Sequence, residues 1–437
     1  MKTVERAVAD QDGVYLAWNS NSNHSNGRGT PAIDRVSRET GTRVWMADRP
    51  LNDNHGNWPT IWTYECCEGF SVWETRQGIA RNDDGIRVWN KATGPRFYPT
   101  DPEQIPRPDW ELASNDSWGE SLVIGNNLWI YNEFALHGPD LGLTARGQRG
   151  QVLLRLNNYG YYDNPNHTPN LPEEQWNYAE DRLGSLASDN GYIYLGADYQ
   201  FTCASNCQAG QPKPFKNGIY AWNVTDGTPR WPMQETTLWS RLSIAANRLY
   251  ALEKDPVTPF KARLVIRNAG FNGSILASSE LMDDSSTGWQ APVLAGGRVI
   301  IATINGFGQT VLRSWDAISL GTPMSQVLPN ATGVRVDYYG TDRLTSYNNT
   351  FGANAARVTT TMVAAVGSKN GATSVPTLVI TSNEGLHVVQ ISTLQELWRY
   401  NKSETGFTDG GRFRDPVIVN NRLYVVDNLR LYAFEAP

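Results

Sequence analysis

Apolar and polar residues alternate in short segments along the whole chain, and these segments come in pairs. The clearest pair lies at residues 421–425 and 431–434, which are separated by a short polar turn. Alternation with a period of two is the pattern of a half-buried β-strand. The first strand of such a pair is expected at residues 13–18, 77–81, 127–131, 191–195, 247–252, 297–301, 377–380 and 421–425, and the second at residues 32–35, 86–89, 152–155, 219–222, 264–267, 312–315, 386–389 and 431–434.

A tryptophan follows several of the second strands after a turn, as at Trp45, Trp231 and Trp398. Gly41 and Gly227 lie in two of these turns, and glycine readily adopts the positive φ that such turns need. We expect each tryptophan to pack against the neighbouring repeat. The repeats are spaced by about 45–70 residues, which is typical of four-stranded blades around a central axis.

The eight pairs predict an all-β protein, built as a single closed β-propeller domain over residues 1–437. Four-stranded antiparallel blades are expected, eight of them, with seven as the alternative. The last repeat has only three recognisable strands, at residues 414–419, 422–426 and 431–434. Because a closed ring avoids exposed strand edges, the N-terminal segment 3–10 is expected to lie beside this last repeat.

The repeat also carries a resemblance to a known group of propellers. Residues 33–45 and 219–231 share the order strand, polar turn, glycine and tryptophan. This unit resembles the repeat of quinoprotein-type propellers, and the resemblance extends over nearly the full chain. It implies an eight-bladed fold of that type.

In a propeller, the residues just before each innermost strand lie on one face, together with the loops between the second and third strands, and function usually lies there. Aromatic and polar side chains recur at this position. The candidate substrate-binding residues are Trp118, Trp239 and Trp289 as apolar walls, with Arg182 and Gln290, and the candidate catalytic hydrogen-bond donors are Arg241, Arg412 and Arg414. The alternative is that the aromatic residues pack between blades and the arginines pair with carboxylates.

Four loops on the same face are long, at residues 19–31, 133–151, 198–217 and 253–262, and we expect them to form a lid. Cys203 and Cys207 lie in the third loop and most simply form a local disulfide that stiffens it. Metal binding is the less favoured interpretation, because no histidine has a suitable spacing. No metal site is expected.

Cys66 and Cys67 are adjacent in the sequence. The segment 66–80 resembles the part of quinone-dependent alcohol dehydrogenases in which a vicinal disulfide stacks on pyrroloquinoline quinone. The resemblance implies a vicinal disulfide here and places both cysteines among the substrate-binding residues. The calcium ligands and the catalytic aspartate of that family are not identified in this sequence, so we expect no cofactor. Two buried thiols or longer-range bridges are the alternative.

The net charge and the possible N-glycosylation sites indicate which binding partners and which cellular compartment to expect. The net charge is -6 and no Lys/Arg cluster stands out, so neither a nucleic acid nor an anionic membrane is an expected partner. Four cysteines and eight Asn-x-Ser/Thr sequons favour a secreted glycoprotein whose signal peptide has been removed, with coincidence as the alternative. The candidate glycosylation sites are Asn23, Asn115, Asn166, Asn223, Asn272, Asn330, Asn348 and Asn401.

Common catalytic motifs are missing from the sequence. The five histidines form no HExxH pair, and there is no GxSxG elbow, phosphate-binding P-loop or GxGxxG before a helix. An aromatic funnel without such motifs favours an enzyme in which binding itself supplies the catalysis. The overall character resembles the secreted fungal propellers that act as hetero-Diels–Alderases in tropolone sesquiterpenoid biosynthesis.

That resemblance implies a small-molecule substrate and the cycloaddition of a quinone methide with a terpene alkene, with an arginine as donor to the substrate oxygen. Two alternatives stay open. One is a quinone-dependent sugar or alcohol dehydrogenase, supported by the fold and by the Cys66–Cys67 segment. The other is a carbohydrate-binding or scaffold propeller without catalytic activity, supported by the many tryptophans.

Overall fold

A computed structural model describes most of the predicted strands and the tight turns between them. The described residues are 2–20, 32–48, 71–73, 77–82, 85–94, 110–113, 121–131, 142–147, 149, 151–157, 176–203, 217–283, 291–305, 307, 309–332, 362–367, 375–381, 385–401, 413, 416–427 and 429–435. Within these residues the regular structure consists of strands, and no helix occurs.

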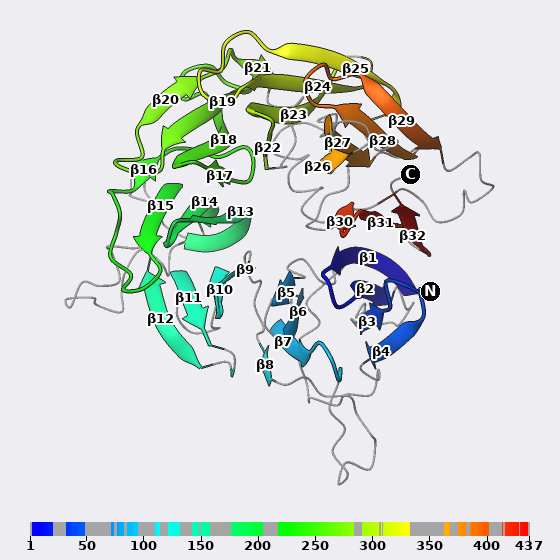
Figure 1. Cartoon of the computed structure of the whole chain (residues 1–437). Helices are drawn as coiled ribbons and strands as arrows, with labels where there is room; N and C mark the ends of the chain where they lie inside the picture. Colours follow the sequence, from blue (N-terminus) through cyan, green and yellow to red (C-terminus); the bar gives the residue numbers. More distant parts are fainter. Residues whose placement is uncertain are drawn as a thin grey trace.

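The strands form antiparallel sheets that follow one another around a ring (Figure 1). Blade 1 contains β1 (Lys2–Ala9), β2 (Val14–Ser20), β3 (Ala32–Val36) and β4 (Arg43–Asp48), and blade 2 contains β5 (Ser71–Trp73), β6 (Gln77–Asn82), β7 (Gly85–Asn90) and β8 (Trp110–Ala113). Blade 3 contains β9 (Ser121–Ile124), β10 (Asn127–Tyr131), β11 (Gly142–Arg146) and β12 (Val152–Asn157). Blade 4 contains β13 (Trp176–Asp189), β14 (Tyr192–Cys203), β15 (Gly218–Asn223) and β16 (Gln234–Glu235).

Blade 5 contains β17 (Ser243–Ala245), β18 (Arg248–Lys254), β19 (Lys261–Asn268), β20 (Ile275–Ser278) and β21 (Met282–Asp283). Blade 6 contains β22 (Val293–Ala295), β23 (Arg298–Ile304), β24 (Gln309–Asp316) and β25 (Met324–Thr332). Blade 7 contains β26 (Met362–Gly367), β27 (Val375–Thr381), β28 (Gly385–Gln390) and β29 (Glu396–Asn401). The last sheet has three strands, β30 (Val417–Val419), β31 (Arg422–Val426) and β32 (Leu431–Glu435), and is called the short blade below.

The prediction of an all-β propeller with four-stranded antiparallel blades is confirmed. Eight blades were favoured and seven were the alternative. The described residues form seven complete blades. The eighth predicted unit is the short blade, which differs because it has no fourth strand in the described residues.

The first and last sheets lie side by side in the ring, as expected for residues 3–10 (Figure 1). Strand β1 lies against β30 and β31 and pairs by hydrogen bonds with β2. Ala7 and Val14 pack with Tyr424 and Val426 in one buried cluster. The ring is therefore closed here by side-chain packing between two sheets and not by a shared sheet.

Tight turns join the first and second strands of several blades, and their central residues have positive φ. In blade 4 these are Asn190 and Gly191, and in the short blade Asn420 and Asn421. Such pairs are typical of type I′ hairpins, whose twist matches that of the strands. The turns close one end of each blade, which is called the turn face; the loops between second and third strands lie at the opposite end, the loop face.

The turns between third and fourth strands dock neighbouring blades together. The N–H of Gly94 donates to the carbonyl of Asn90 to close such a turn in blade 2, and Gly94 has a φ of 71°. A Cβ atom on Gly94 would lie 2.6 Å from Cγ of Trp45, which belongs to blade 1. A Cβ atom on Gly273 of blade 5 would lie 2.6 Å from Cγ of Gln234 and 3.1 Å from Cε3 of Trp231, both of blade 4. The predicted packing of Trp45 and Trp231 between blades is therefore confirmed.

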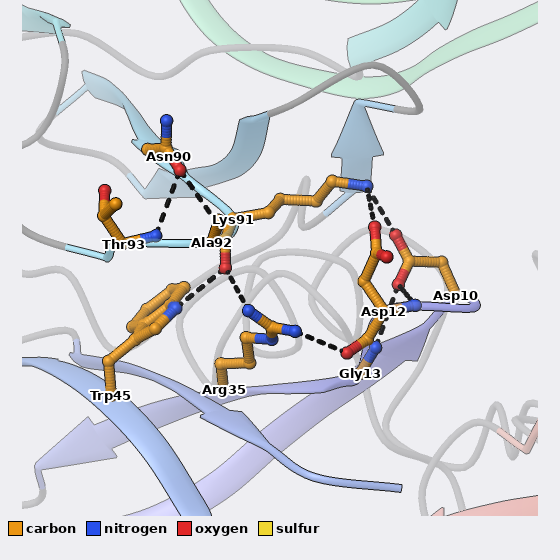
Figure 2. A network of polar contacts seen from close by, with 9 residues as sticks. All are labelled: Asp10, Asp12, Gly13, Arg35, Trp45, Asn90, Lys91, Ala92 and Thr93. Carbon is orange, nitrogen blue, oxygen red and sulfur yellow. Dashed lines mark hydrogen bonds and ion pairs between the residues drawn. The ribbon is translucent and has the colours of Figure 1, made fainter.

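A polar network reinforces the contact between blades 1 and 2 (Figure 2). Trp45 Nε1 and Arg35 Nη1 both donate to the main-chain oxygen of Lys91, at 2.9 and 2.8 Å. The Lys91 side chain is buried and its Nζ lies 2.6 Å from Asp10 Oδ2 and 3.2 Å from Asp12 Oδ2. Because the ammonium group is paired with two carboxylates, its burial is compensated and the two blades are held in register on the turn face.

The hydrophobic core consists of layers between neighbouring blades. Leu264 and Ile266 of blade 5, for example, pack with Val299 and Trp315 of blade 6 in one buried cluster. In these described residues each blade therefore helps to bury the apolar face of the next.

One predicted loop contains a strand. Residues 133–151 were expected to form a long loop, and β11 (Gly142–Arg146) lies inside it. Strand β12 (Val152–Asn157) is consequently the outer strand of blade 3 and not its third. The strand was not predicted because its alternating stretch is short and is flanked by Gly138, Pro139 and Gly147, which are typical of loops.

Candidate functional site

Two of the predicted site residues are described with their side chains, Trp239 and Arg241. They lie in the segment that leads from blade 4 to the innermost strand β17 of blade 5. For Arg182 and Cys203 the backbone alone is described, within β13 and at the end of β14. The other predicted site residues lie outside the described residues: Cys66, Cys67, Trp118, Cys207, Trp289, Gln290, Arg412 and Arg414.

The segment with Trp239 runs along β18 and is held by an irregular ladder. The N–H of Trp239 donates to the carbonyl of Leu252 at 2.7 Å, and the N–H of Leu252 donates to Ser240 Oγ at 2.8 Å. The hydroxyl of Ser240 thus takes the place of a main-chain acceptor. This arrangement places Trp239 in the core between blades 5 and 6, where it is 1% exposed.

Lys254 joins this aromatic residue to the loop face. Its Nζ lies 4.0 Å from the centroid of a Trp239 ring, which is within the range of a cation–π contact. The indole therefore supports a cation at the loop face, and the position of Trp239 agrees with the alternative that this side chain packs between blades.

Arg241 is half-buried at the junction of blades 4 and 5. The next residue, Leu242, donates its N–H to Ser185 Oγ of β13 at 2.8 Å. The backbone around Arg241 is therefore fixed by the innermost strands of two blades.

The loop between β18 and β19 presents apolar side chains to solvent. Val257 is 83% exposed and Phe260 is 66% exposed. Asp255 shapes this loop: its carboxylate accepts the N–H of Thr258 at 2.8 Å and forms an ion pair with Arg263. The hydrogen bonds from Thr258 and the charge of Arg263 lower the pKa of Asp255, so this carboxylate stays ionised as a structural anchor.

The equivalent loop of blade 6 has the same construction. Asn305 Oδ1 accepts the N–H groups of Phe307 and Gln309, both at 3.0 Å, and Phe307 is 89% exposed. Two neighbouring blades thus hold exposed phenylalanines on structured loops of one face. We call Val257, Phe260 and Phe307 the apolar loop cluster.

Behind the loop of blade 5 lies a buried ion pair. Arg267 donates to both carboxylate oxygens of Glu253, at 2.6 and 2.7 Å, and Thr236 Oγ1 donates to the second oxygen at 2.7 Å. Both charged side chains are buried and mutually satisfied. Glu253 therefore fixes the base of the loop.

Sequence reasoning missed the apolar loop cluster, although residues 253–262 were expected to form a long loop. The signal is an Asp or Asn that follows the second strand and precedes exposed aromatic residues, as in Asp255 to Phe260 and Asn305 to Phe307. Side-chain turns of this kind are formed by Asp and Asn because their short carboxyl or amide group reaches nearby main-chain N–H groups.

Of the five histidines, His387 is the one within the described residues, and it is fully buried with Nδ1 2.6 Å from Glu396 Oε1. Within the described residues no group of three or more His, Cys, Asp or Glu side chains is placed to hold a metal ion. No helix in the described part of the chain is long and apolar enough to cross a membrane.

The sequence matches no protein-family model and no curated protein. Among solved structures, the quinohemoprotein alcohol dehydrogenase from Comamonas testosteroni is similar over 97% of this chain and 70% of its own length, with 12% identity and a TM-score of 0.53. A europium-containing methanol dehydrogenase matches over 97% and 83% of the two chains, with 12% identity and a TM-score of 0.47. Sqt1 from Saccharomyces cerevisiae matches over 86% and 83%, with 11% identity and a TM-score of 0.46. The first likeness shows the propeller fold alone.

Proposed function

We propose that this chain is a small-molecule enzyme that binds an apolar, aromatic substrate on the loop face of blades 5 and 6. The observation that carries the proposal is the apolar loop cluster. Phe260 and Phe307 are exposed on the loops of two neighbouring blades, and each loop is held by its own internal hydrogen bonds. Exposed apolar side chains gathered on one face can mark a binding site, whereas single exposed ones are common on any protein surface.

The reaction we propose is the hetero-Diels–Alder cycloaddition of a quinone methide with a terpene alkene. One carbon–carbon and one carbon–oxygen bond form together, and the quinone methide regains its aromatic ring, so no proton is transferred and no group leaves. Holding the two reactants in one orientation can lower the barrier by about 7–11 kcal/mol. We propose Arg241 or Lys254 of blade 5 as the cation that stabilises negative charge on the carbonyl oxygen.

The experiment is to release an ortho-quinone methide in situ with a sesquiterpene alkene, with and without the protein. We expect faster adduct formation and an excess of one enantiomer. Heat-denatured protein is the control for reaction in solution. A racemic adduct formed at the solution rate would contradict the proposal.

The quinone-dependent dehydrogenase remains the alternative, and Cys66 and Cys67, which support it, lie outside the described residues. Adding pyrroloquinoline quinone and Ca²⁺ and then measuring dye reduction with alcohols and sugars separates the two functions. Our proposal expects no dye reduction, and substrate-dependent reduction would favour the dehydrogenase.

We also propose that the chain passes through the secretory pathway. The exposed turn of blade 5 supports this, since Asn272 Oδ1 accepts from Ser274 N and Oγ at 3.1 and 2.7 Å within an accessible sequon. Asn223, Asn330 and Asn401 also belong to described strands, whereas Asn23, Asn115, Asn166 and Asn348 lie outside the described residues. Expression in a secreting eukaryotic host should give a mass that falls on enzymatic deglycosylation; an unchanged mass would contradict the proposal.

A further inference from the structure

Three residues with large apolar side chains adopt a positive φ in the described part of the chain. They are Phe260, Leu320 and Leu394, with φ values of 62°, 55° and 58°. The left-handed region is unfavourable for such residues because the Cβ atom approaches the next carbonyl oxygen. Each of the three positions therefore carries backbone strain that another interaction has to offset.

For the two leucines, packing between blades offsets this strain. Leu320 is 2% exposed in the buried cluster of blades 5 and 6, and Leu394 is fully buried in the cluster of blades 6 and 7. Phe260 differs from both, because it is 66% exposed. Burial within the protein therefore offsets much less of the strain at Phe260 than at the leucines.

The loop around Phe260 enforces its conformation. The N–H of Asp255 donates to the carbonyl of Lys261 at 2.9 Å and closes the loop, and Asp255 Oδ2 accepts the N–H of Thr258 at 2.8 Å. Pro259 fixes its own φ, so the chain turns into β19 at Phe260. A left-handed residue at the end of a hairpin loop is usually glycine or asparagine, and a phenylalanine at this position opposes the local backbone preference.

We propose that Phe260 determines the specificity of the loop-face site, because its ring stacks on the planar, conjugated reactant. This inference rests on the proposed function and assigns one of the two reactants to a residue. An exposed aromatic ring on a closed loop offers a face and an edge to another aromatic ring, and an aliphatic alkene cannot match that contact. Strained residues cluster at ligand contacts, and here the contact with the reactant offsets the strain.

The test measures the binding of 7-methoxycoumarin, a neutral and planar aromatic probe, to the whole chain by fluorescence anisotropy. Coumarin and octahydrocoumarin, its saturated analogue, are the competitors. We expect saturable binding of the probe. Coumarin should displace it at a concentration about three- to tenfold lower than octahydrocoumarin, because only coumarin can stack on the ring.

Variants of Phe260 separate stacking from apolar contact. Phe260→Leu keeps an apolar side chain and should weaken probe binding about three- to tenfold, whereas Phe260→Tyr keeps the ring and should retain the affinity. Phe260→Asn should weaken binding about tenfold or more. It should also raise the melting temperature by about 1–2 °C, because asparagine tolerates the left-handed region.

Phe271→Asn is the matched control, since Phe271 is 77% exposed on the turn face of the same blade. It should change neither the affinity nor the melting temperature. The proposal is overturned if the probe does not bind, if coumarin and octahydrocoumarin compete equally, or if Phe260→Asn binds the probe as tightly as the unchanged protein. A lower melting temperature of Phe260→Asn also overturns it, because the ring would then be stabilised by packing in the free protein.

The binding assay contains no reaction, so its outcome is separate from that of the proposed function. An excess of one enantiomer that survives Phe260→Asn and Phe260→Leu would reject this inference and leave the cycloaddition standing. A racemic adduct formed at the solution rate, together with probe binding that depends on Phe260, would reject the cycloaddition and support the stacking contact.

Discussion

Backbone conformation at single residues sets part of the stability of this propeller. The turn between β17 and β18 uses Ala246 and Asn247, with φ values of 48° and 57°. The equivalent turn of blade 6 uses Gly296 and Gly297. Alanine in the left-handed region costs about 1–2 kcal/mol, because its Cβ approaches the next carbonyl oxygen.

Ala246→Gly should therefore stabilise the protein by about 0.5–1 kcal/mol, after the larger chain entropy of glycine is counted. Urea unfolding monitored by tryptophan fluorescence gives this free energy. Ala245→Gly, one position earlier within β17, is the control and should destabilise by a similar amount. A destabilising effect of Ala246→Gly would show that strain at this turn is not released by glycine.

Tyr220 gives the protein a dependence on alkaline pH. Its ring is buried and stacked on Trp222 with a centroid distance of 5.5 Å, and burial raises the pKa of Tyr220 to about 12. In the unfolded chain this phenol titrates near pH 10. Between pH 10 and 12 the unfolded state loses the proton and the folded state keeps it, so the free energy of unfolding falls as the pH rises.

Tyr220→Phe removes this contribution. Relative to the unchanged protein, the variant should gain up to roughly 2–3 kcal/mol between pH 9 and pH 12. Denaturant unfolding of both proteins across this pH range measures the difference. A constant difference at all pH values would mean that Tyr220 has an ordinary pKa in the folded state.

At the scale of the element, neighbouring blades contact each other through two parts. The turn after the third strand of one blade packs against the fourth strand of the preceding blade. At Gly94 and Gly273 a tryptophan of the preceding blade lies against the turn, and at Gly227 the side chain of Leu156 does. Where the turn has a leucine in the same conformation, as at Leu320 and Leu394, that side chain is itself buried between the blades. The volume between blades is thus conserved by two different arrangements.

Gly94→Ala should destabilise the protein by about 2–4 kcal/mol, because the new methyl group overlaps the Trp45 ring and strains the turn. Gly41→Ala is the matched control: its φ is equally positive but its surroundings are open, so it should cost only about 1 kcal/mol. In a Trp45→Ala background the two substitutions should become equal, which a double-mutant cycle measures. Equal costs in the unchanged background would contradict the proposed packing.

Sequence alone predicted the elements that repeat and missed what individual blades do differently. The alternating strands and the tryptophans Trp45 and Trp231 follow from local patterns that each blade shares. Strand β11 was missed because its short alternating stretch, residues 143–146, lies among Gly138, Pro139, Gly142 and Gly147, which are typical of loops. The three strands of the last repeat were predicted as well, and the described residues of the short blade form three strands.

The candidate site was predicted less completely than the fold. The position of Trp239 before an innermost strand followed from the repeat, but its burial against blade 6 depends on the hydrogen bonds of Ser240. The exposed phenylalanines were missed because an exposed aromatic residue and a core residue look alike in a sequence. Only the turns built by Asp255 and Asn305 distinguish them.

At the scale of the whole molecule, the ring separates stability from function. The turn face holds the blades together through the docked tryptophans and the Lys91 network (Figure 2). The loop face of blades 5 and 6 carries the exposed apolar side chains of Val257, Phe260 and Phe307. We therefore expect changes on the turn face to alter stability and changes on the loop face to alter activity.

The enantiomeric ratio of the cycloadduct tests this account most directly, measured with Phe260→Ser and Phe307→Ser on the loop face and Phe271→Ser on the turn face. Phe271 is the matched control, because it is 77% exposed on the opposite end of blade 5. The account predicts that the two loop-face variants lose most of the selectivity and rate at an unchanged melting temperature, while Phe271→Ser keeps both. Full selectivity in the loop-face variants, or an equal loss in Phe271→Ser, would contradict the assignment of the substrate to this face.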